Sequence, residues 1–504
     1  MSIAMLLDSV ASTMPDRVLV GSREGGLTAG GLASLAARGA SVVRASAADA
    51  VGFVGLSGTA FPAALFASAL AGVPFTPLNY RLQADQLAEL AAGLGARPFL
   101  IADSQYADAV REVPNAVVVT TEEWLASARA AEEIEPEDVD DERPAVVLYT
   151  SGTTSKPKGA VLRHSHLVSY VLQTVEFAAS DEEDAALISV PPYHVAGVGT
   201  VLTNTFSGRR MVYLPNFAAP EWLDVVRAER ITQAMLVPTM LARVVDHLDG
   251  RPADLPTLRA IAYGGARMPG PVLEQALTAL PQAAFTNAYG LTETSSTIAV
   301  LGPDDHREAL AATEPAVRAR LASAGRLVPG VEGQIRDELG QVLPAGETGQ
   351  LWVRGGQVSG EYLGAGSVLD EQGWFHTRDE GWFDEDGYLF ISGRTDDTII
   401  RGGENIAPAE IEDVLFGHPA VKEAAVIGVP DDEWGARLVA VVVPEPGSSV
   451  DGEEIRNFVR ARLRGSRTPD NVVFRTELPH TPTGKLLRRE LVRDVQNGAV
   501  ATTR

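Results

Sequence analysis

The stretch "YTSGTTSKPKG" at residues 149–159 joins two apolar segments of a 504-residue chain. Its small, polar residues are typical of a plain loop, since clusters of Ser, Thr and Gly between periodic segments usually form loops. The same composition suits a phosphate cradle, in which backbone N–H groups and hydroxyls surround oxyanions while lysines supply positive charge. The sequence around the stretch decides between these two interpretations.

The segments on either side of this stretch alternate between apolar, β-branched runs and Ala/Leu-rich helical patterns. Examples are "VGFVGL", "FPAALFASALA", "RPFLIAD", "AVVLYT", "MVYLP", "ITQAMLVP" and "LRAIAYGG". Such alternation predicts βαβ units, with parallel or mixed sheets covered by helices. Residues 51–80 carry no charge, but glycines and prolines interrupt the roughly 20 continuous apolar residues that a membrane span needs. We therefore expect a strand, a turn, a buried helix and a second strand there.

The composition excludes several classes of protein. The formal net charge of −24 argues against nucleic-acid binding and against broad adsorption to anionic membranes. The chain has no cysteine, which excludes disulfides, thiolate metal sites, iron–sulfur clusters and a cysteine nucleophile. Residues 1–17 lack a basic region and carry Asp8, so they predict an amphipathic helix and not a signal peptide. We expect a cytoplasmic protein without a transmembrane segment.

The pattern of the sequence changes in its C-terminal third. From about residue 330, short alternating strands with Gly and Asp turns predict a small β-rich subdomain. After "GRTDD" at 393–397, helices and strands form a separate pattern that predicts a small α+β domain. A chain of this length is expected to form two or more domains. The predicted fold class is α/β multidomain, with a large N-terminal domain of βαβ-type sheets.

Further motifs follow the opening stretch in a fixed order. They are "PPYHVAG" (191–197), "YGGARM" (263–268), "NAYGLTET" (287–294), "GWFHTRDEG" (373–381), "ISGRTDDTIIRGGENIAPAEIE" (391–412) and "PTGK" (482–485). The opening stretch lacks the G-x-x-x-x-G-K-[ST] spacing of a Walker loop. The ordered set resembles the AMP-forming acyl-CoA synthetases, fatty-acid and aryl-acid ligases of the adenylate-forming superfamily. The resemblance runs from near Ala4 to near Val492 and favours the phosphate cradle.

The resemblance implies ATP, Mg²⁺ and CoA as cofactor and co-substrates. A carboxylate must first become a mixed anhydride with AMP, because forming a thioester from it directly is uphill. That step brings two anions together, so it needs cations, hydrogen-bond donors and a hard metal ion held by a carboxylate. Glu293 and Thr150 match the metal ligands of the family. A helix-capping carboxylate after Thr292 is the competing structural interpretation of Glu293.

The resemblance also assigns the nucleotide contacts. The phosphate loop comprises Thr150, Ser151, Gly152, Thr153, Thr154 and Lys158, and the adenine-binding segments comprise Gly264, Gly265, Ala266, Asn287, Ala288, Tyr289, Gly290 and Thr292. Asp379 matches a carboxylate that accepts hydrogen bonds from the ribose hydroxyls, and Arg394 matches an arginine directed at ribose or phosphate. On local sequence alone, Asp379 is equally typical of a turn.

Asp396 corresponds to the hinge of the family. The implied domains are 1–393 for adenylation, 394–397 for the hinge, and 398–504 for a mobile C-terminal domain. Lys485 matches a lysine that bridges the carboxylate and the α-phosphate during adenylation. At a helix start its charge would oppose the helix dipole, which adds to the functional interpretation.

His194 matches an aromatic or His gate beside the acyl pocket. A buried structural histidine is the alternative. The predicted catalytic set is Lys485, Glu293, Thr150 and His194. His164 and His166 are not predicted to bind a metal, because no third ligand is evident.

Two positions depart from the family. Arg378 replaces the glycine that normally precedes the ribose-binding aspartate. If that backbone needs a positive φ, the arginine costs stability and shifts Asp379; the alternative is an added cation near the nucleotide. The segment "LRGSRTPDN" (463–471) lacks the usual Lys-x-Pro, with Arg467 the nearest match, which puts a contact of the C-terminal domain in doubt.

The sequence gives less information on the acceptor of the acyl group and on the carboxylic acid that is activated. Gly402 and Gly403 in "RGGEN" resemble the CoA tunnel of CoA-dependent members, so CoA is favoured over a carrier protein. Gly290, in place of a bulky Trp, and the small residues Ala196, Gly197 and Gly199 predict room for a medium or long chain, a ring or a sterol-like acid. No Arg stands beside Tyr289, which disfavours a dicarboxylate.

Three functions stay open at this stage: a CoA ligase, an acyl-adenylate ligase that loads a carrier protein, and a nucleotide-binding relative without catalysis. The expected partners are small molecules, with no nucleic acid, and a homodimer is compatible with the sequence.

Overall fold

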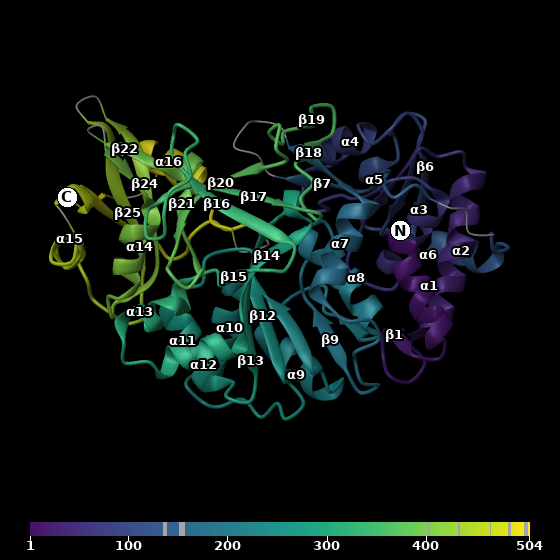
Figure 1. The fold of residues 1–504 in the computed structure, drawn as a ribbon, viewed down its shortest axis with the longest axis horizontal. Helices are drawn as coiled ribbons and strands as arrows, with labels where there is room; N and C mark the ends of the chain where they lie inside the picture. The colour runs from purple at the N-terminus through teal and green to yellow at the C-terminus, as the bar shows by residue number, and fades with distance from the viewer. Residues whose placement is uncertain are drawn as a thin grey trace.

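The computed structural model describes residues 1–134, 139–150, 157–401, 404–431, 434–463, 465–481 and 485–497, together with the backbone of 502–503. Figure 1 shows the N-terminal helices (purple) at one end of an elongated molecule and the C-terminal elements (yellow-green) at the other. The central strands (teal to green) lie between these ends.

An eight-stranded sheet and a nine-stranded sheet form the bulk of the protein. The eight-stranded sheet has the order β19-β18-β8-β7-β4-β3-β5-β6, with β3 Ala50–Val54, β4 Phe75–Pro77, β5 Pro98–Ala102, β6 Val117–Thr120, β7 Pro144–Thr150, β8 Lys158–Arg163, β18 Glu361–Tyr362 and β19 Gly366–Ser367. The nine-stranded sheet has the order β15-β14-β13-β12-β11-β9-β10-β1-β2, with β1 Val18–Val20, β2 Leu27–Thr28, β9 Ala185–Ile188, β10 Arg210–Tyr213, β11 Gln233–Leu236, β12 Ala260–Gly264, β13 Ala284–Leu291, β14 Ser296–Leu301 and β15 Arg326–Leu327.

The main hydrophobic core lies between these two sheets. Five of its helices are α1 Ile3–Thr13, α2 Ala29–Ala45, α3 Ala60–Ala71, α7 His164–Thr174 and α8 Val195–Ser207, and α6 Thr121–Ala130 packs on α2. Helix α3 is buried along almost its whole length, because it has no charged residue and both sheets cover it. The uncharged stretch 51–80 therefore forms the expected strand, helix and strand inside the core. Among the described helices, none combines the length and the apolar character that crossing a membrane requires.

The outer face of each sheet carries its own helices. The nine-stranded sheet packs against α9 Ala219–Ala228, α10 Pro238–Leu248 and α11 Gly270–Ala279, and the eight-stranded sheet packs against α4 Ala84–Ala92 and α5 Ala107–Val110. The remaining helices of this region are α12 Pro303–Ala311 and α13 Pro315–Ala319. Parallel strands with helices on both faces confirm the predicted βαβ-type architecture.

A four-stranded antiparallel sheet forms the β-rich subdomain that the sequence predicts after residue 330. Its strands, in the order β16-β17-β20-β21, are β16 Val331–Arg336, β17 Gly349–Gly355, β20 Phe375–Phe383 and β21 Leu389–Arg394. A 3₁₀ turn, η3 Thr395–Asp397, leads out of β21 toward the C-terminal region. The predicted hinge residues therefore lie where this sheet ends.

The C-terminal region forms an α+β unit with two small sheets. They comprise β22 Ile399–Arg401 with β23 Glu404–Ile406, and β24 Val421–Asp431, β25 Gly435–Pro444, β26 Asn471–Phe474 and β27 Thr502–Thr503. Its helices are α14 Pro408–Phe416, α15 Gly452–Arg460 and α16 Arg488–Gln496. Separate apolar clusters cover the two faces of the larger sheet, so this region has its own core. It contacts the N-terminal region through ion pairs, one of which joins Lys422 Nζ to Asp246 Oδ2 at 2.8 Å.

Candidate active site

Asp379 lies buried in β20, opposite Arg394 of β21, and is 6% exposed. The pairing of β20 with β17 shifts register between Gln350 and Trp352, so residues 377–379 form an irregularity in the strand. Bulges of this kind re-aim side chains next to functional sites. Here the Asp379 carboxylate forms an ion pair with Arg394 Nε at 2.9 Å and accepts a hydrogen bond from the Tyr289 hydroxyl. Asp379 is therefore a fixed strand residue, and the turn interpretation is wrong.

The electrostatics of Asp379 reflect its burial. Desolvation raises the pKa of its carboxyl, while Arg394 and the Tyr289 hydroxyl oppose that shift. Burial, followed by the charge of Asp379, raises the pKa of Tyr289 well above its ordinary value. The Tyr289 hydroxyl therefore keeps its proton at neutral pH and donates it to Asp379. Each Asp379 oxygen accepts from one protein donor and can accept a second hydrogen bond from a hydroxyl of a ligand.

The two predicted adenine-binding segments lie side by side at the ends of neighbouring parallel strands. Gly264 ends β12 and is paired with Ala288 of β13. A Cβ at Gly264 would meet the Ala288 carbonyl oxygen at 2.2 Å, so only glycine allows this approach. The strand ends thus bring residues 264–266 and 287–290 together, as the sequence predicts.

Glu293 lies in a 3₁₀ turn, η1 Thr292–Thr294, at 9% exposure. Its Oε1 accepts a hydrogen bond from the Tyr362 hydroxyl at 2.6 Å, and its backbone carbonyl accepts one from Ser359 N at 2.8 Å. The turn is capped by Thr294, whose hydroxyl accepts from Leu291 N at 3.0 Å. The helix-capping interpretation of Glu293 is therefore wrong, because Thr294 performs that role.

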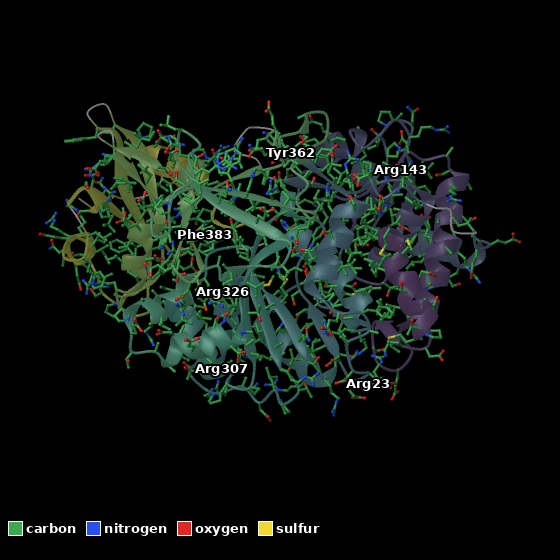
Figure 2. All side chains as sticks on the ribbon, viewed as in Figure 1. Arg23, Arg143, Arg307, Arg326, Tyr362 and Phe383 are labelled. Carbon is green, nitrogen blue, oxygen red and sulfur yellow. The ribbon has the colours of Figure 1, made fainter. Side chains whose placement is uncertain are left out.

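The ends of the predicted phosphate loop lie close to Glu293. Thr150 and Lys158 are directly opposed in the antiparallel pair of β7 and β8, and the Lys158 ammonium lies 5.6 Å from the ring centroid of Tyr362. Figure 2 shows Tyr362 near the top of the view, between the two ends of the molecule. The loop residues Ser151, Gly152, Thr153 and Thr154 lie outside the described residues.

The donor set around Glu293 fits magnesium. The Glu293 carboxylate accepts its hydrogen bond from Tyr362 through Oε1, and this carboxylate and the Thr150 hydroxyl at the end of β7 both offer hard oxygen atoms. Within the described ranges, no group of three His, Cys, Asp or Glu residues is arranged to hold a metal alone. Such a sparse protein contribution suits Mg²⁺, which keeps waters and binds substrate phosphates.

Lys485 approaches the Asp379 site from the C-terminal region. Desolvation and the charge of Arg394 lower the pKa of Lys485, while Asp397, Asp379 and Asp396 oppose the shift. Lys485 is exposed to solvent, so the lysine borders the site instead of being enclosed by it. The sequence predicts that Lys485 starts a helix, and this prediction is wrong. Leu486 pairs with His480, and α16 begins only at Arg488.

His194 precedes α8, and its ring lies 4.7 Å from that of Tyr193. Desolvation and then the charge of Arg81 lower the pKa of His194 to about 4, so the imidazole is neutral at pH 7. Its geometry fits either a gate or a structural histidine. A neutral imidazole can donate or accept a hydrogen bond but does not attract an anion.

Several interpretations of small residues are corrected by the packing. A Cβ at Gly290 would meet the Ser296 carbonyl oxygen at 1.7 Å, and one at Gly197 would meet the Pro191 carbonyl oxygen at 2.6 Å. A Cβ at Gly199 would contact the Tyr170 ring at 3.4 Å. Gly197 and Gly290 therefore serve close backbone packing and are not evidence of room for a large acid, whereas the contact at Gly199 is an ordinary van der Waals distance.

The two departures from the family pattern have structural explanations. Arg378 has φ of 63°, the left-handed region that favours glycine, yet its guanidinium lies 3.6 Å from Asp396. Asp379 keeps its partners despite this backbone. Arg467 forms ion pairs with Glu404 and Glu410 inside the C-terminal region. Gly402 and Gly403 lie outside the described residues.

The sequence did not reveal the residues that support the site. Tyr362 and Thr377 carry no local signal of function. Tyr362 reaches Glu293 because β18 pairs with β8 and because Glu361 is fixed by two hydrogen bonds of 2.9 Å from Arg163. Thr377 Oγ1 accepts from Asp379 N at 3.1 Å and donates to Leu351 O. Such contacts depend on strand pairing across almost 200 residues of sequence, which no short motif encodes.

Comparisons with known proteins match this arrangement. Residues 7–363 match the family model of the AMP-binding enzymes, and residues 410–485 match the model of the AMP-binding enzyme C-terminal domain. The chain is 35% identical to a feruloyl-CoA synthase from Amycolatopsis sp over 94% of this chain and 95% of that protein. It is also 35% identical to a fatty acid–[acyl-carrier-protein] ligase from Streptomyces coeruleorubidus over 88% of this chain and 86% of that protein.

A solved structure shows the same fold. The o-succinylbenzoate CoA synthetase of Bacillus subtilis, in complex with its acyl-adenylate intermediate, matches with a TM-score of 0.83 at 29% identity. The match covers 96% of this chain and 97% of the synthetase, which has also been solved with ATP and a magnesium ion.

The chain therefore belongs to the family of AMP-binding enzymes, the adenylate-forming superfamily. Within it, the protein is an AMP-forming acyl-CoA synthetase, a class that uses ATP, Mg²⁺ and CoA. An enzyme is thus identified, and the interpretation as a non-catalytic relative is wrong.

Proposed function

We propose that this protein activates a monocarboxylic acid with an apolar body, aromatic, cyclic or medium- to long-chain, and transfers the acyl group to CoA. In the first step a carboxylate oxygen attacks the α-phosphorus of ATP, and the bond to pyrophosphate breaks. In the second step the CoA sulfur attacks the acyl carbon, and AMP leaves. The proposal rests above all on one observation, the approach of Lys485 to the Asp379–Arg394 pair.

Each described residue has a distinct proposed role. Asp379 accepts hydrogen bonds from the ribose, and Arg394 holds that carboxylate ionised and adds positive charge beside the phosphates. Lys485 stabilises the charge that moves from the acid to the α-phosphate. Glu293 and Thr150 supply oxygen ligands for Mg²⁺, which neutralises phosphate charge when bound.

We propose three parts of the chain: residues 1–393 form the adenylation domain, 394–397 the hinge, and 398–504 a mobile C-terminal domain. The interdomain ion pairs support a hinge, since those between Lys422 and Asp246 and between Arg267 and Asp413 are exposed, the former at 37% and 52% side-chain exposure. Exposed pairs of this kind contribute about 0–1 kcal/mol each, so they do not prevent rotation. We place the enzyme in the cytoplasm, where ATP and CoA are both present.

A carrier protein is the second candidate acceptor, favoured by the relative that loads fatty acids onto one. Gly402 and Gly403 of "RGGEN" favour CoA through the family resemblance.

The test incubates the protein with ATP, Mg²⁺ and a panel of ferulic, phenylacetic, octanoic and palmitic acids, with CoA in one arm and holo-acyl-carrier protein in the other. We expect AMP and pyrophosphate in equal amounts and an acyl-CoA in the first arm. Acyl transfer in the second arm alone would identify the carrier-protein ligase. ADP as the stoichiometric product would exclude the adenylating mechanism altogether.

A further inference from the structure

Three carboxylates act on Lys485, and each has an arginine of its own. Asp379 is paired with Arg394 at 2.9 Å, Asp396 lies 3.6 Å from Arg378, and Asp397 lies 3.9 Å from Arg488. No ion pair of the Lys485 ammonium is found among the described residues, although all three carboxylates raise its affinity for a proton. The arginines therefore leave the lysine without a fixed carboxylate partner.

The two hinge aspartates are held from opposite sides. Asp396 is paired with Arg378 of β20, in the N-terminal region, while Asp397 faces Arg488 of α16, in the C-terminal region. Arg488 is fixed in turn by two hydrogen bonds to the Glu412 carboxylate, of 2.5 and 2.9 Å. Adjacent residues of the chain are thus attached to different bodies of the protein.

Arg378 occupies its position at a cost in backbone energy. Its φ of 63° lies in the left-handed region, where a residue with a Cβ is strained. The irregularity in β20 between the pairs with β17 imposes this conformation. Strained residues of this kind cluster at active sites, and the observed outlier motivates the hypothesis that the Arg378 side chain has a function.

We propose that Arg378 is a positioning residue that engages Asp396 and keeps this carboxylate off Lys485. The proposal rests on the proposed function, because it assigns Lys485 to adenylation. Without the guanidinium, Asp396 would be the one carboxylate of these three that has lost its arginine. Lys485 would then pair with Asp396 and become less available to the acid and the α-phosphate.

The first experiment measures Lys485 directly and needs no substrate. The chain has four lysines, Lys156, Lys158, Lys422 and Lys485, so reductive ¹³C-methylation gives a short NMR spectrum in which a Lys485→Arg variant assigns the resonance. The groups that face the ammonium are Arg394, Asp379, Asp396 and Asp397. We expect Arg378→Gly to raise the pKa of Lys485 and a second change, Asp396→Asn, to cancel that rise. An unchanged Lys485 titration in Arg378→Gly would overturn the proposal.

The second experiment measures ATP–pyrophosphate exchange with the acid of the panel that the wild type turns over fastest. We expect Arg378→Gly and Arg378→Ala to lower the exchange rate by about two- to five-fold, the range of a partly exposed ion pair, with an unchanged KM for ATP. Arg378→Lys should recover part of the rate. In the Asp396→Asn background, Arg378→Gly should have no further effect.

The outcomes separate the two proposals. Equal losses in both backgrounds, or a raised KM for ATP with an unchanged rate constant, would overturn the role of Arg378 and indicate a contact with the nucleotide. A wild-type enzyme that exchanges pyrophosphate with no acid of the panel would contradict the proposed function, while the NMR titration would still decide the pairing of Arg378 with Asp396.

Discussion

The Tyr362 hydroxyl donates a hydrogen bond to Glu293 Oε1 at 2.6 Å, and the Lys158 ammonium lies over the ring of the same tyrosine. One side chain thereby connects the proposed metal ligand to the end of the phosphate loop. The bond fixes the orientation of the Glu293 carboxylate, so that the other oxygen is presented in one direction. A ligand held in this way binds a metal more tightly than a freely rotating one.

Glu293→Gln should keep the fold but raise the Mg²⁺ concentration needed for half-maximal activity by about 10- to 100-fold, because an amide oxygen is a poorer ligand for a hard dication. The measurement is AMP release across a magnesium titration, with the exposed Glu371→Gln as a matched control. An unchanged magnesium dependence would rule out Glu293 as a ligand.

Tyr362→Phe should shift the same magnesium titration in the same direction by about 10-fold, since it removes the bond that orients Glu293. The ring and its contact with Lys158 remain in this variant. If the titration shifts only in Glu293→Gln and stays at the wild-type midpoint in Tyr362→Phe, the orienting role of the tyrosine is wrong.

Arg378→Gly should be more stable than Arg378→Ala by about 1 kcal/mol, because only glycine adopts the observed φ of 63° without strain. Both variants lose the guanidinium, so the difference between their free energies of unfolding reports the backbone strain at residue 378. Chemical denaturation at neutral pH measures it. Equal stabilities would show that this position carries no strain.

His194 should make the protein less stable in mild acid. Its pKa is about 4 in the folded state against 6.5 in the unfolded chain. Between these values only the unfolded state takes up the proton, so the stabilisation is complete above pH 6.5 and is lost as the pH falls toward 4. His194 should therefore account for about 1–2 kcal/mol of the loss between pH 7.5 and pH 5. The free energy of unfolding of His194→Gln should fall by that much less than that of the wild type over the same pH interval. An identical fall in both proteins would show that His194 does not cause the loss.

The sequence was sufficient to predict the architecture and to single out candidate site residues, because both depend on local signals. Apolar periodicity marks the strands and helices, and the short motifs contain Asp379 within β20, Arg394 at the end of β21 and Glu293 in the turn after β13. Contacts that depend on distant strand pairing were not predictable, which is why Tyr362 and Thr377 were missed. The glycines at 197 and 290 were misinterpreted for the same reason, since only the fold shows that backbone atoms fill the space beside them.

The central claim is that Lys485 serves adenylation and not thioester formation. Its position beside Asp379 and Arg394 supports this, while we propose from the family resemblance that the "RGGEN" stretch serves the CoA step. The most direct test offers Lys485→Ala two sets of substrates, acid with ATP and supplied acyl-AMP with CoA. The expected result is a loss of acyl-AMP formation by at least about 100-fold, in line with the removal of one group that stabilises transition-state charge, with thioester formation close to the wild-type rate. Equal losses in both half-reactions, or full acyl-AMP formation by the variant, would contradict the account.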